Sequence, residues 1–374
     1  MELRSRELAK AQDMLQSSGG LEKARSFKEN ASHALHLAMQ DLSQVLDRLA
    51  DQPNDHGNLE VLFSMWFLIL HFGIYDSDLV QMSYMHLNGM RSFVAEYLHG
   101  TAARRIYNLP PAAKQLLVYI CYLDVMLALG GMGGGHLTID LMNAPAESPV
   151  CFDRLFEEAR VCVPQLWGSE YPAEELLDDI ENYRPLKFVH ACQKLKLSVW
   201  RLGLGGFSEV DETPWQSRRD LWREIEQLGE EFYDIRLLAE TVRRTDGRRV
   251  VWTVYHACLD FYASQVLYSC IEDFDFQPEW LQDVLAKLLG IAYKALNEDP
   301  QHVYRYAWAL RVALFRVRDP IHRDWLETQI VKASVLLSNL GIPSDPLAAA
   351  GTRETLFVEH NHIGSRAQQQ SDTG

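Results

Sequence analysis

The chain has 374 residues, of which 47% are hydrophobic and 23% are charged. This composition is typical of a folded globular protein and excludes a disordered or collagen-like chain. Lysine and arginine total 36 against 51 aspartate and glutamate residues, so the formal net charge is −15. An acidic chain repels nucleic-acid phosphates and anionic lipid headgroups, which disfavours direct binding to either.

The six cysteines are widely spaced, and no C-x-x-C pair occurs among them. This spacing excludes zinc fingers, zinc ribbons and thioredoxin-type redox motifs. The first residues, Met1-Glu2-Leu3-Arg4, open a polar segment without the apolar stretch of a secretory signal. We therefore expect an intracellular protein with reduced thiols.

Helical periodicity dominates the first third of the chain. Apolar residues between 31 and 49 recur every three or four positions, which predicts an amphipathic helix. Residues 59–72 are apolar nearly all round and predict a central helix, and an Asp-Ser-Asp cluster opens a further helix over 76–98. A Pro-Pro pair at 110–111 predicts the first turn of a helix that ends at the glycine run 130–135. The apolar stretches are shorter than the roughly 20 residues of a membrane span, so we expect no membrane insertion.

Residues 131–185 break this periodicity with prolines and short acidic segments, and we interpret them as an internal insertion or cover. The second half of the chain is more regular. Its expected helices cover residues 215–244, 250–271, 280–296, 302–317 and 321–340.

The fold class predicted from these patterns is all-α, because segments that alternate like strands are scarce. We expect a single large multi-helix domain of about ten to twelve packed helices over residues 30–342. An N-terminal helical extension covers residues 1–29, and a disordered C-terminal tail covers residues 343–374.

Most motifs that suggest chemistry have a simpler structural explanation. The glycine run 130–135 lacks the lysine of a phosphate-binding loop and ends a helix, so we interpret it as a flexible connection. His360 and His362 form an H-x-H pair in the expected tail, where we expect solvation rather than metal binding. Because no nucleophile–base pair or metal-ligand set is recognisable, the sequence predicts no catalytic, cofactor-binding or metal residues and no enzyme.

Two positions keep alternative interpretations. Asp124 lies in an apolar helical run, and a buried carboxylate there must be paired or neutralised. It is either an acid or ligand anchor, or a hydrogen-bonded core carboxylate, and we favour the core carboxylate. The one dense basic cluster consists of Arg243, Arg244, Arg248 and Arg249. It is either a nuclear-import patch or a solvated turn between two helices, and the solvated turn is the default.

Three segments carry distinctive residue patterns. Residues 65–75 form an apolar aromatic run, and residues 83–91 follow with the pattern aromatic-x-His-Leu-x-Gly. Residues 118–128 form an aromatic helix in which Asp124 stands four positions before an alanine. Near the C-terminal end, residues 306–326 combine a helix of the pattern Trp-x-Leu-x-x-Ala with the pattern Asp-Pro-x-x-Arg-x-Trp.

In this order the three patterns resemble the fungal-specific transcription factor domain, which is the regulatory half of fungal binuclear zinc-cluster activators. His86, Leu87 and Gly89 match the family, while Tyr84 stands where the family often has tryptophan and Met90 replaces a small residue.

The matched residues also have a physical interpretation. We expect Gly89 to permit close approach of two helices. We expect Arg323 or Asp319 to pair at a helix junction, with Trp308 and Trp325 packed in the core.

The resemblance implies an all-α regulatory domain in the nucleus that controls a metabolic or secondary-metabolite gene cluster. The family's DNA-binding module repeats C-x-x-C-x(6)-C around two zinc ions, and this sequence does not contain it. We therefore expect a transcriptional regulator that acts through a DNA-binding partner or the transcription machinery, or one whose zinc cluster lies in a missing N-terminal exon. The alternatives are a non-DNA-binding ligand-responsive or scaffold protein, located in the cytoplasm, and, less favoured, a biosynthetic-cluster enzyme with a helical pocket. A small-molecule effector and the oligomeric state stay open.

Overall fold

The computed structural model describes residues 37, 40–52, 54–74, 80–98, 109–130, 133–203, 214–242, 248–272 and 278–339. Over these residues the chain is 88% helical, with thirteen helices, α3 to α15, and no strand. The predicted all-α class is confirmed. The expected extension 1–29 and tail 343–374 lie outside the described residues.

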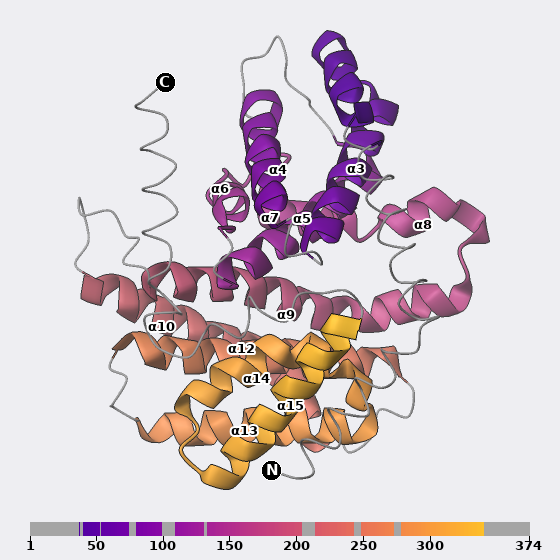
Figure 1. Ribbon diagram of the computed structural model, residues 1–374. Coiled ribbons are helices and arrows are strands. Elements are labelled where there is room, and N and C mark those ends of the chain that lie inside the picture. Colours follow the sequence, from indigo (N-terminus) through magenta and orange to yellow (C-terminus); the bar gives the residue numbers. More distant parts are fainter. Residues whose placement is uncertain are drawn as a thin grey trace, which may run out of the picture.

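The long helix α9 (Ala173–Gly203) crosses the middle of the molecule, with one group of helices on either side of it (Figure 1). The N-terminal group follows a helical stretch over 40–51 and consists of α3 (His56–Ile74), α4 (Val80–Phe93) with a π-helical turn (Val94–Leu98), α5 (Pro111–Leu129), α6 (His136–Met142), α7 (Phe152–Ala159) and α8 (Cys162–Trp167). The C-terminal group consists of α10 (Pro214–Glu231), α11 (Tyr233–Thr241), α12 (Arg249–Glu272), α13 (Glu279–Glu298), α14 (Val303–Arg316) and α15 (Pro320–Asn339).

The spacing of apolar residues explains the central position of α9. One face of the helix, with steps of four and three, consists of Phe188, Cys192, Leu195, Val199 and Leu202. This face is buried in the C-terminal core, mainly against α12. On the opposite side of the helix, Leu197 and Trp200 pack against Val125 and Ala128 of α5. A helix with two apolar sides must be covered on both, so α9 belongs to both groups.

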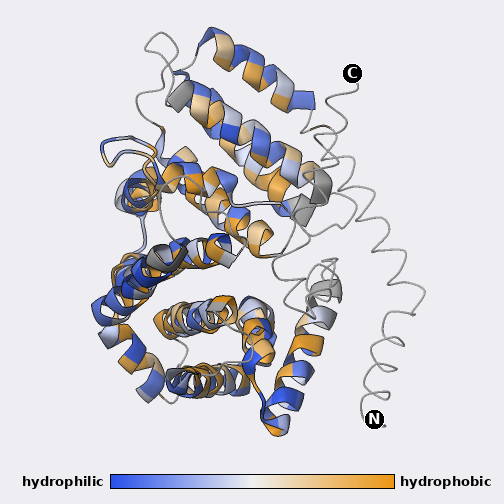
Figure 2. Cartoon of the chain, turned by 90° about the vertical axis from the view of Figure 1, so that its left-hand side faces the viewer, coloured by the Kyte–Doolittle hydropathy of each residue, from blue (hydrophilic) through white to orange (hydrophobic). Residues whose placement is uncertain are grey.

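Each group has its own hydrophobic core. In the N-terminal group, Phe63, Trp66 and Phe93 pack edge to face between α3 and α4. In the C-terminal group, α12 is buried almost all round by α9, α13 and α14. Most other helices carry hydrophobic residues on one side and hydrophilic residues on the other (Figure 2).

The second half of the chain departs from the expected helix boundaries at two places. Pro185 does not end the irregular stretch, because α9 runs through it from Ala173 to Gly203. Proline inside a helix costs about 3 kcal/mol, and the burial of Pro185 and of the apolar sides that follow it opposes that cost. The helix expected over 215–244 divides at Phe232, whose buried ring stacks on Phe188 at 4.5 Å.

The stretch 131–185, which we interpreted as an insertion or cover, instead contributes to the core. It contains α6, α7, α8 and the first turns of α9, and these short helices raise the helix count above the expected ten to twelve. Phe152 and Leu155 of α7 are buried in the N-terminal core. Periodicity missed these helices because each spans only six to eight residues.

Gly133, Gly134 and Gly135 form a tight turn before α6, in place of the flexible connection predicted there, while residues 131 and 132 of the predicted run lie outside the described residues. A Cβ atom on Gly134 would lie 2.2 Å from the backbone oxygen of Asp124, so only glycine fits there. Gly135 has φ of +91° and lies between Ala128 of α5 and Leu197 of α9. The turn therefore lies between α5 and α9, where there is no room for residues larger than glycine.

Helix α5 is long and apolar enough to cross a bilayer by length and composition alone, and the core helix of a soluble protein meets the same criteria. About half of its apolar window is buried within the protein, where it packs against α3, α7 and α9. We therefore describe α5 as a core helix of the N-terminal group.

We predict that Gly134→Ala lowers the free energy of unfolding by about 1–3 kcal/mol, because the new methyl group overlaps the α5 backbone. Gly89→Ala is the matched control, since a Cβ atom on Gly89 meets nothing within 4 Å. That change in an exposed helix interior should raise stability by about 0.5–1 kcal/mol. Urea unfolding measures both values, and an equal effect of the two substitutions would contradict the tight packing of the turn.

Candidate functional site

A polar chain of side chains links α5, α7 and α9, and it runs from the buried His190 to Asp153, whose side chain is 60% exposed. His190 of α9 is 3% exposed and lies between the rings of Phe152 and Phe156 of α7. Its Nε2 lies 3.0 Å from Oδ1 of Asp153, and its Nδ1 lies 3.1 Å from the hydroxyl of Tyr122. An ionised carboxylate only accepts, so in a neutral His190 the Nε2–H donates to Asp153 and Nδ1 accepts from Tyr122.

The electrostatics of this chain favour a neutral histidine. Burial lowers the pKa of His190, although Asp153 opposes that shift. Asp153 accepts hydrogen bonds from His190 and from Lys194, which hold its pKa well below the usual range of a carboxyl group. Burial raises the pKa of the Tyr122 hydroxyl well above its ordinary value, so Tyr122 stays protonated at neutral pH. The polar chain of Tyr122, His190, Asp153 and Lys194 therefore acts as a fixed set of hydrogen-bond donors and acceptors.

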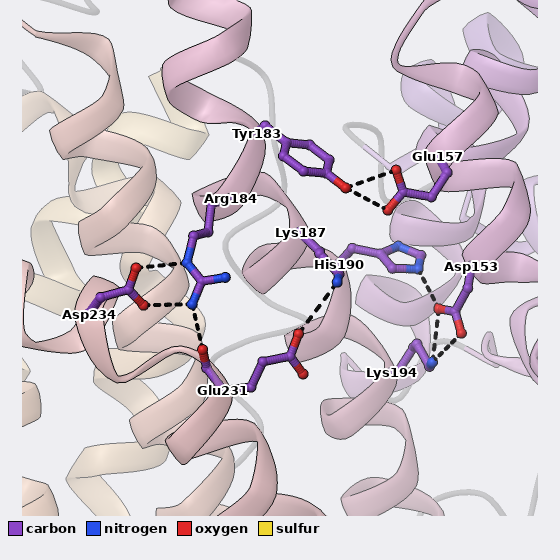
Figure 3. A network of polar contacts seen from close by, with 9 residues as sticks. All are labelled: Asp153, Glu157, Tyr183, Arg184, Lys187, His190, Lys194, Glu231 and Asp234. Carbon is purple, nitrogen blue, oxygen red and sulfur yellow. Dashed lines mark hydrogen bonds and ion pairs between the residues drawn. The ribbon is translucent and has the colours of Figure 1, made fainter.

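Further polar contacts connect α9 to its other neighbours (Figure 3). Arg184 makes a two-point contact with Asp234 at 2.7 and 2.8 Å, and also donates to the backbone oxygen of Glu231. On the α7 side, the Tyr183 hydroxyl donates to Glu157 at 3.1 Å. Exposed ion pairs add little stability, so we interpret these contacts mainly as fixing the register of α9 between the two groups.

A cavity of about 170 Å³ adjoins the polar chain, and we name it the junction cavity. It lies between α5, α7, α8 and α9, and the Tyr122 side chain lines it. Its aromatic wall consists of Tyr119, Tyr122 and Phe156, and its polar lining consists of Gln115, Arg160 and Asp179. Concave sites with an aromatic wall and a few polar groups are typical of small-molecule binding.

A second buried polar cluster lies inside the C-terminal core. Asp260 of α12 is fully buried and pairs with Lys196 of α9, and His256 lies 3.2 Å from the same carboxylate oxygen. Burial alone would raise the pKa of Asp260, but Lys196 and His256 outweigh burial and lower it. The Lys196 ammonium also lies 4.4 Å from the centre of the Trp308 ring. The pair joins α9 to α12 with its charges satisfied.

Asp124 takes the structural role that we favoured. Its carboxylate is buried and accepts from the Gly135 amide at 2.8 Å and from the Thr138 amide and hydroxyl at 2.9 and 2.8 Å. It thereby caps the N-terminus of α6 from a neighbouring helix. Burial raises the pKa of Asp124, while these hydrogen bonds oppose the rise.

The basic cluster is described only in part. Arg248 and Arg249 are exposed, as expected of a solvated turn, and residues 243–247 lie outside the described residues. Arg248 pairs with Glu181 at 2.5 Å, and Arg249 pairs with Glu175 at 2.8 Å. These acidic partners come from α9, so at least half of the cluster is matched by carboxylates. The pair His360 and His362 also lies outside the described residues, and among the described ones no group of His, Cys, Asp or Glu could hold a metal.

The residues that carry the family resemblance have different contacts from those expected. Gly89 lies on an exposed face and permits no close helix approach. Asp319 does not pair with the Arg323 side chain, because it accepts from the Ile321 and His322 amides and caps α15. Arg323 pairs instead with Glu327, one turn further along α15.

Trp308 and Trp325 both pack on the C-terminal core, as expected. Trp325 packs near Tyr293 of α13, with ring centres 6.2 Å apart, and Trp308 lies under Lys196.

Sequence reasoning missed the polar chain and the buried Lys196–Asp260 pair. His190, Lys194 and Lys196 lie on one helix, but their partners Asp153 and Asp260 are 37 to 64 residues away. The one available signal was charged residues at apolar positions, since Lys196 and Asp260 interrupt the apolar spacing of α9 and α12.

The chain matches no protein-family model, no curated protein and no solved structure. The resemblance to the fungal-specific transcription factor domain therefore stays a prediction from the sequence motifs.

We predict that His190 contributes to a loss of stability in mild acid. Its pKa in the folded protein is below the unfolded value of about 6.5, so below that pH the unfolded chain binds a proton that the folded chain does not. The free energy of unfolding should fall between pH 7 and pH 5, by at most about 1.4 kcal/mol per pH unit for this group. Asp153 has a depressed pKa and adds its own loss only below about pH 4.

In His190→Gln the free energy of unfolding should fall less steeply between pH 7 and pH 5, as measured by urea unfolding across that range. The slope should not vanish, because burial also lowers the pKa of His71, His86 and His302. An unchanged slope would show that His190 does not titrate as its burial requires.

Proposed function

We propose that the chain is a transcriptional regulator of the fungal-specific class that reaches DNA through a DNA-binding partner. The observation that carries the proposal is the presence of three family-like patterns in family order along one all-α chain. We further propose that it acts in the nucleus on a metabolic or secondary-metabolite gene cluster, which is what the resemblance implies.

The residues of the second pattern support the proposal, because they depend on one another in three dimensions. Asp124 caps α6, and a Cβ atom on Gly135 would approach the side chain of Ala128 to 3.1 Å. A small residue four positions after the aspartate is therefore needed for the glycine turn to approach α5. The Asp-x-x-x-Ala pattern is thus a structural requirement of this helical architecture.

Charge supports action through a partner. The chain has a formal net charge of −15, which opposes contact with the phosphate backbone. Arg248 and Arg249 are already paired with carboxylates of α9. Binding DNA phosphates would require these arginines to exchange carboxylates for phosphates, and the carboxylates of Glu175 and Glu181 left beside them would repel the phosphates.

We predict that the purified chain alone does not retard promoter DNA at physiological salt. When a zinc-cluster partner is added, the chain should join the partner–DNA complex and retard it further. In the source organism, chromatin crosslinking should find the tagged chain at a set of promoters, and deletion of the gene should change transcripts of a gene cluster. A cytoplasmic protein with no promoter occupancy and an unchanged transcriptome would overturn the proposal and favour a ligand-responsive or scaffold protein.

A further inference from the structure

The junction cavity has the size of a site for one aromatic ring. Its volume is about 170 Å³. This volume is close to that of an engineered closed cavity of about 150 Å³ that binds benzene, but the junction cavity opens to solvent beside Tyr119, which is 47% exposed. Tyr119, Tyr122 and Phe156 lie around it, and aromatic rings pack against one another edge to face or offset.

The charged groups of the cavity do not neutralise each other. Arg160 and Asp179 both line it, yet no ion pair joins them. The Arg160 guanidinium lies 3.5 Å from the centre of the Tyr183 ring, and among the described residues no carboxylate pairs with it. The opposite charges therefore face the same small space as separate groups.

The remaining polar groups, Asp179 and Gln115, keep hydrogen-bonding capacity that the described residues do not use. Asp179 accepts a hydrogen bond from the Tyr171 hydroxyl through Oδ2 at 2.5 Å, and its second oxygen has no donor among the described residues. Gln115 likewise makes no side-chain hydrogen bond within the part of the chain that the structure describes. A ligand that complements this lining needs an anionic group for Arg160, a donor for Asp179 and a ring between them.

We propose that the junction cavity binds a single-ring aromatic acid that carries a hydroxyl or amino group. The carboxylate pairs with the Arg160 guanidinium, whose planar donors match the two oxygens of a carboxylate. The hydroxyl or amino group donates to Asp179, and the ring lies against Tyr119, Tyr122 and Phe156. This inference goes beyond the proposed function and holds whether or not the chain regulates transcription.

Such a ligand would contact two residues that hold His190 in the polar chain. Tyr122 lines the cavity and donates to His190, while Phe156 lines the cavity and stacks on His190. Asp179 belongs to α9, and Arg160 directly follows α7. Because the ligand bridges α5, α7 and α9, its binding stabilises the folded chain by an amount that grows with the logarithm of the ligand concentration above Kd.

The test titrates the full chain with 4-hydroxybenzoate by calorimetry and by ligand-observed NMR. A Kd on the order of 0.1–1 mM is expected of a ligand with about ten non-hydrogen atoms. Benzoate lacks the donor and phenol lacks the acid, so each should bind more weakly than 4-hydroxybenzoate. Cyclohexanecarboxylate differs from benzoate only in lacking the aromatic ring, so it should bind more weakly than benzoate.

Two substitutions and one control locate the binding. Arg160→Gln should weaken binding of 4-hydroxybenzoate by about 10- to 100-fold, because a charge-assisted pair is lost. Gln115→Leu removes a polar lining group but no side-chain hydrogen bond among the described residues, and it should weaken binding by a smaller factor. Arg154→Gln is the matched control, since Arg154 pairs with Glu158 outside the cavity lining and its loss should leave binding unchanged.

Thermal unfolding of each variant without ligand shows whether it is folded before its affinity is compared. Saturable binding that Arg160→Gln weakens and Arg154→Gln does not would support the proposal. No saturable binding of 4-hydroxybenzoate, or equal affinity of the Arg160→Gln and Arg154→Gln proteins, would overturn it.

Discussion

The structure depends on one helix that must bury two opposite faces. The face of α9 that begins at Phe188 belongs to the C-terminal core, and the side with Leu197 and Trp200 belongs to the contact with α5. Neither group of helices can cover both faces alone. The close approach on the α5 side depends on the glycine turn 133–135, because a Cβ atom on Gly135 would lie 2.9 Å from Leu197.

The polar features follow from this central helix. Once the apolar faces of α9 are covered, its remaining positions lie at the boundaries between helices, where charged side chains find partners on both sides. His190 and Lys194 meet α7, while Arg184 meets α11. The junction cavity lies at the same boundary, where the short helices α7 and α8 leave space beside α5 and α9. A ligand there would act on the contacts that hold the two groups together.

Much of this fold can be predicted from the sequence, and the features that could not be predicted share one physical reason. Long periodic segments such as α12 and α13 were predicted within two residues, because their burial repeats along the chain. The glycine turn was misread, since its role depends on Asp124 and Leu197, which are distant in sequence. The structural role of Asp124 was predicted correctly, because a carboxylate among apolar neighbours requires hydrogen-bond partners, whichever part of the chain supplies them. The polar chain around His190 forms where three helices meet and the junction cavity where four meet, and no local sequence pattern specifies those arrangements.

The most direct measurement is hydrogen–deuterium exchange of the Leu195→Ala protein, with Leu177→Ala as control. Leu195 is fully buried on the α12 side of α9, and its truncation costs about 2–5 kcal/mol, whereas Leu177 lies on the same helix and is 60% exposed. If α9 joins both groups into one cooperative unit, protection of α5 amides falls with that of α12 amides in Leu195→Ala and neither falls in Leu177→Ala. Loss of protection confined to α12 and its C-terminal neighbours, with α5 unchanged, would contradict this account.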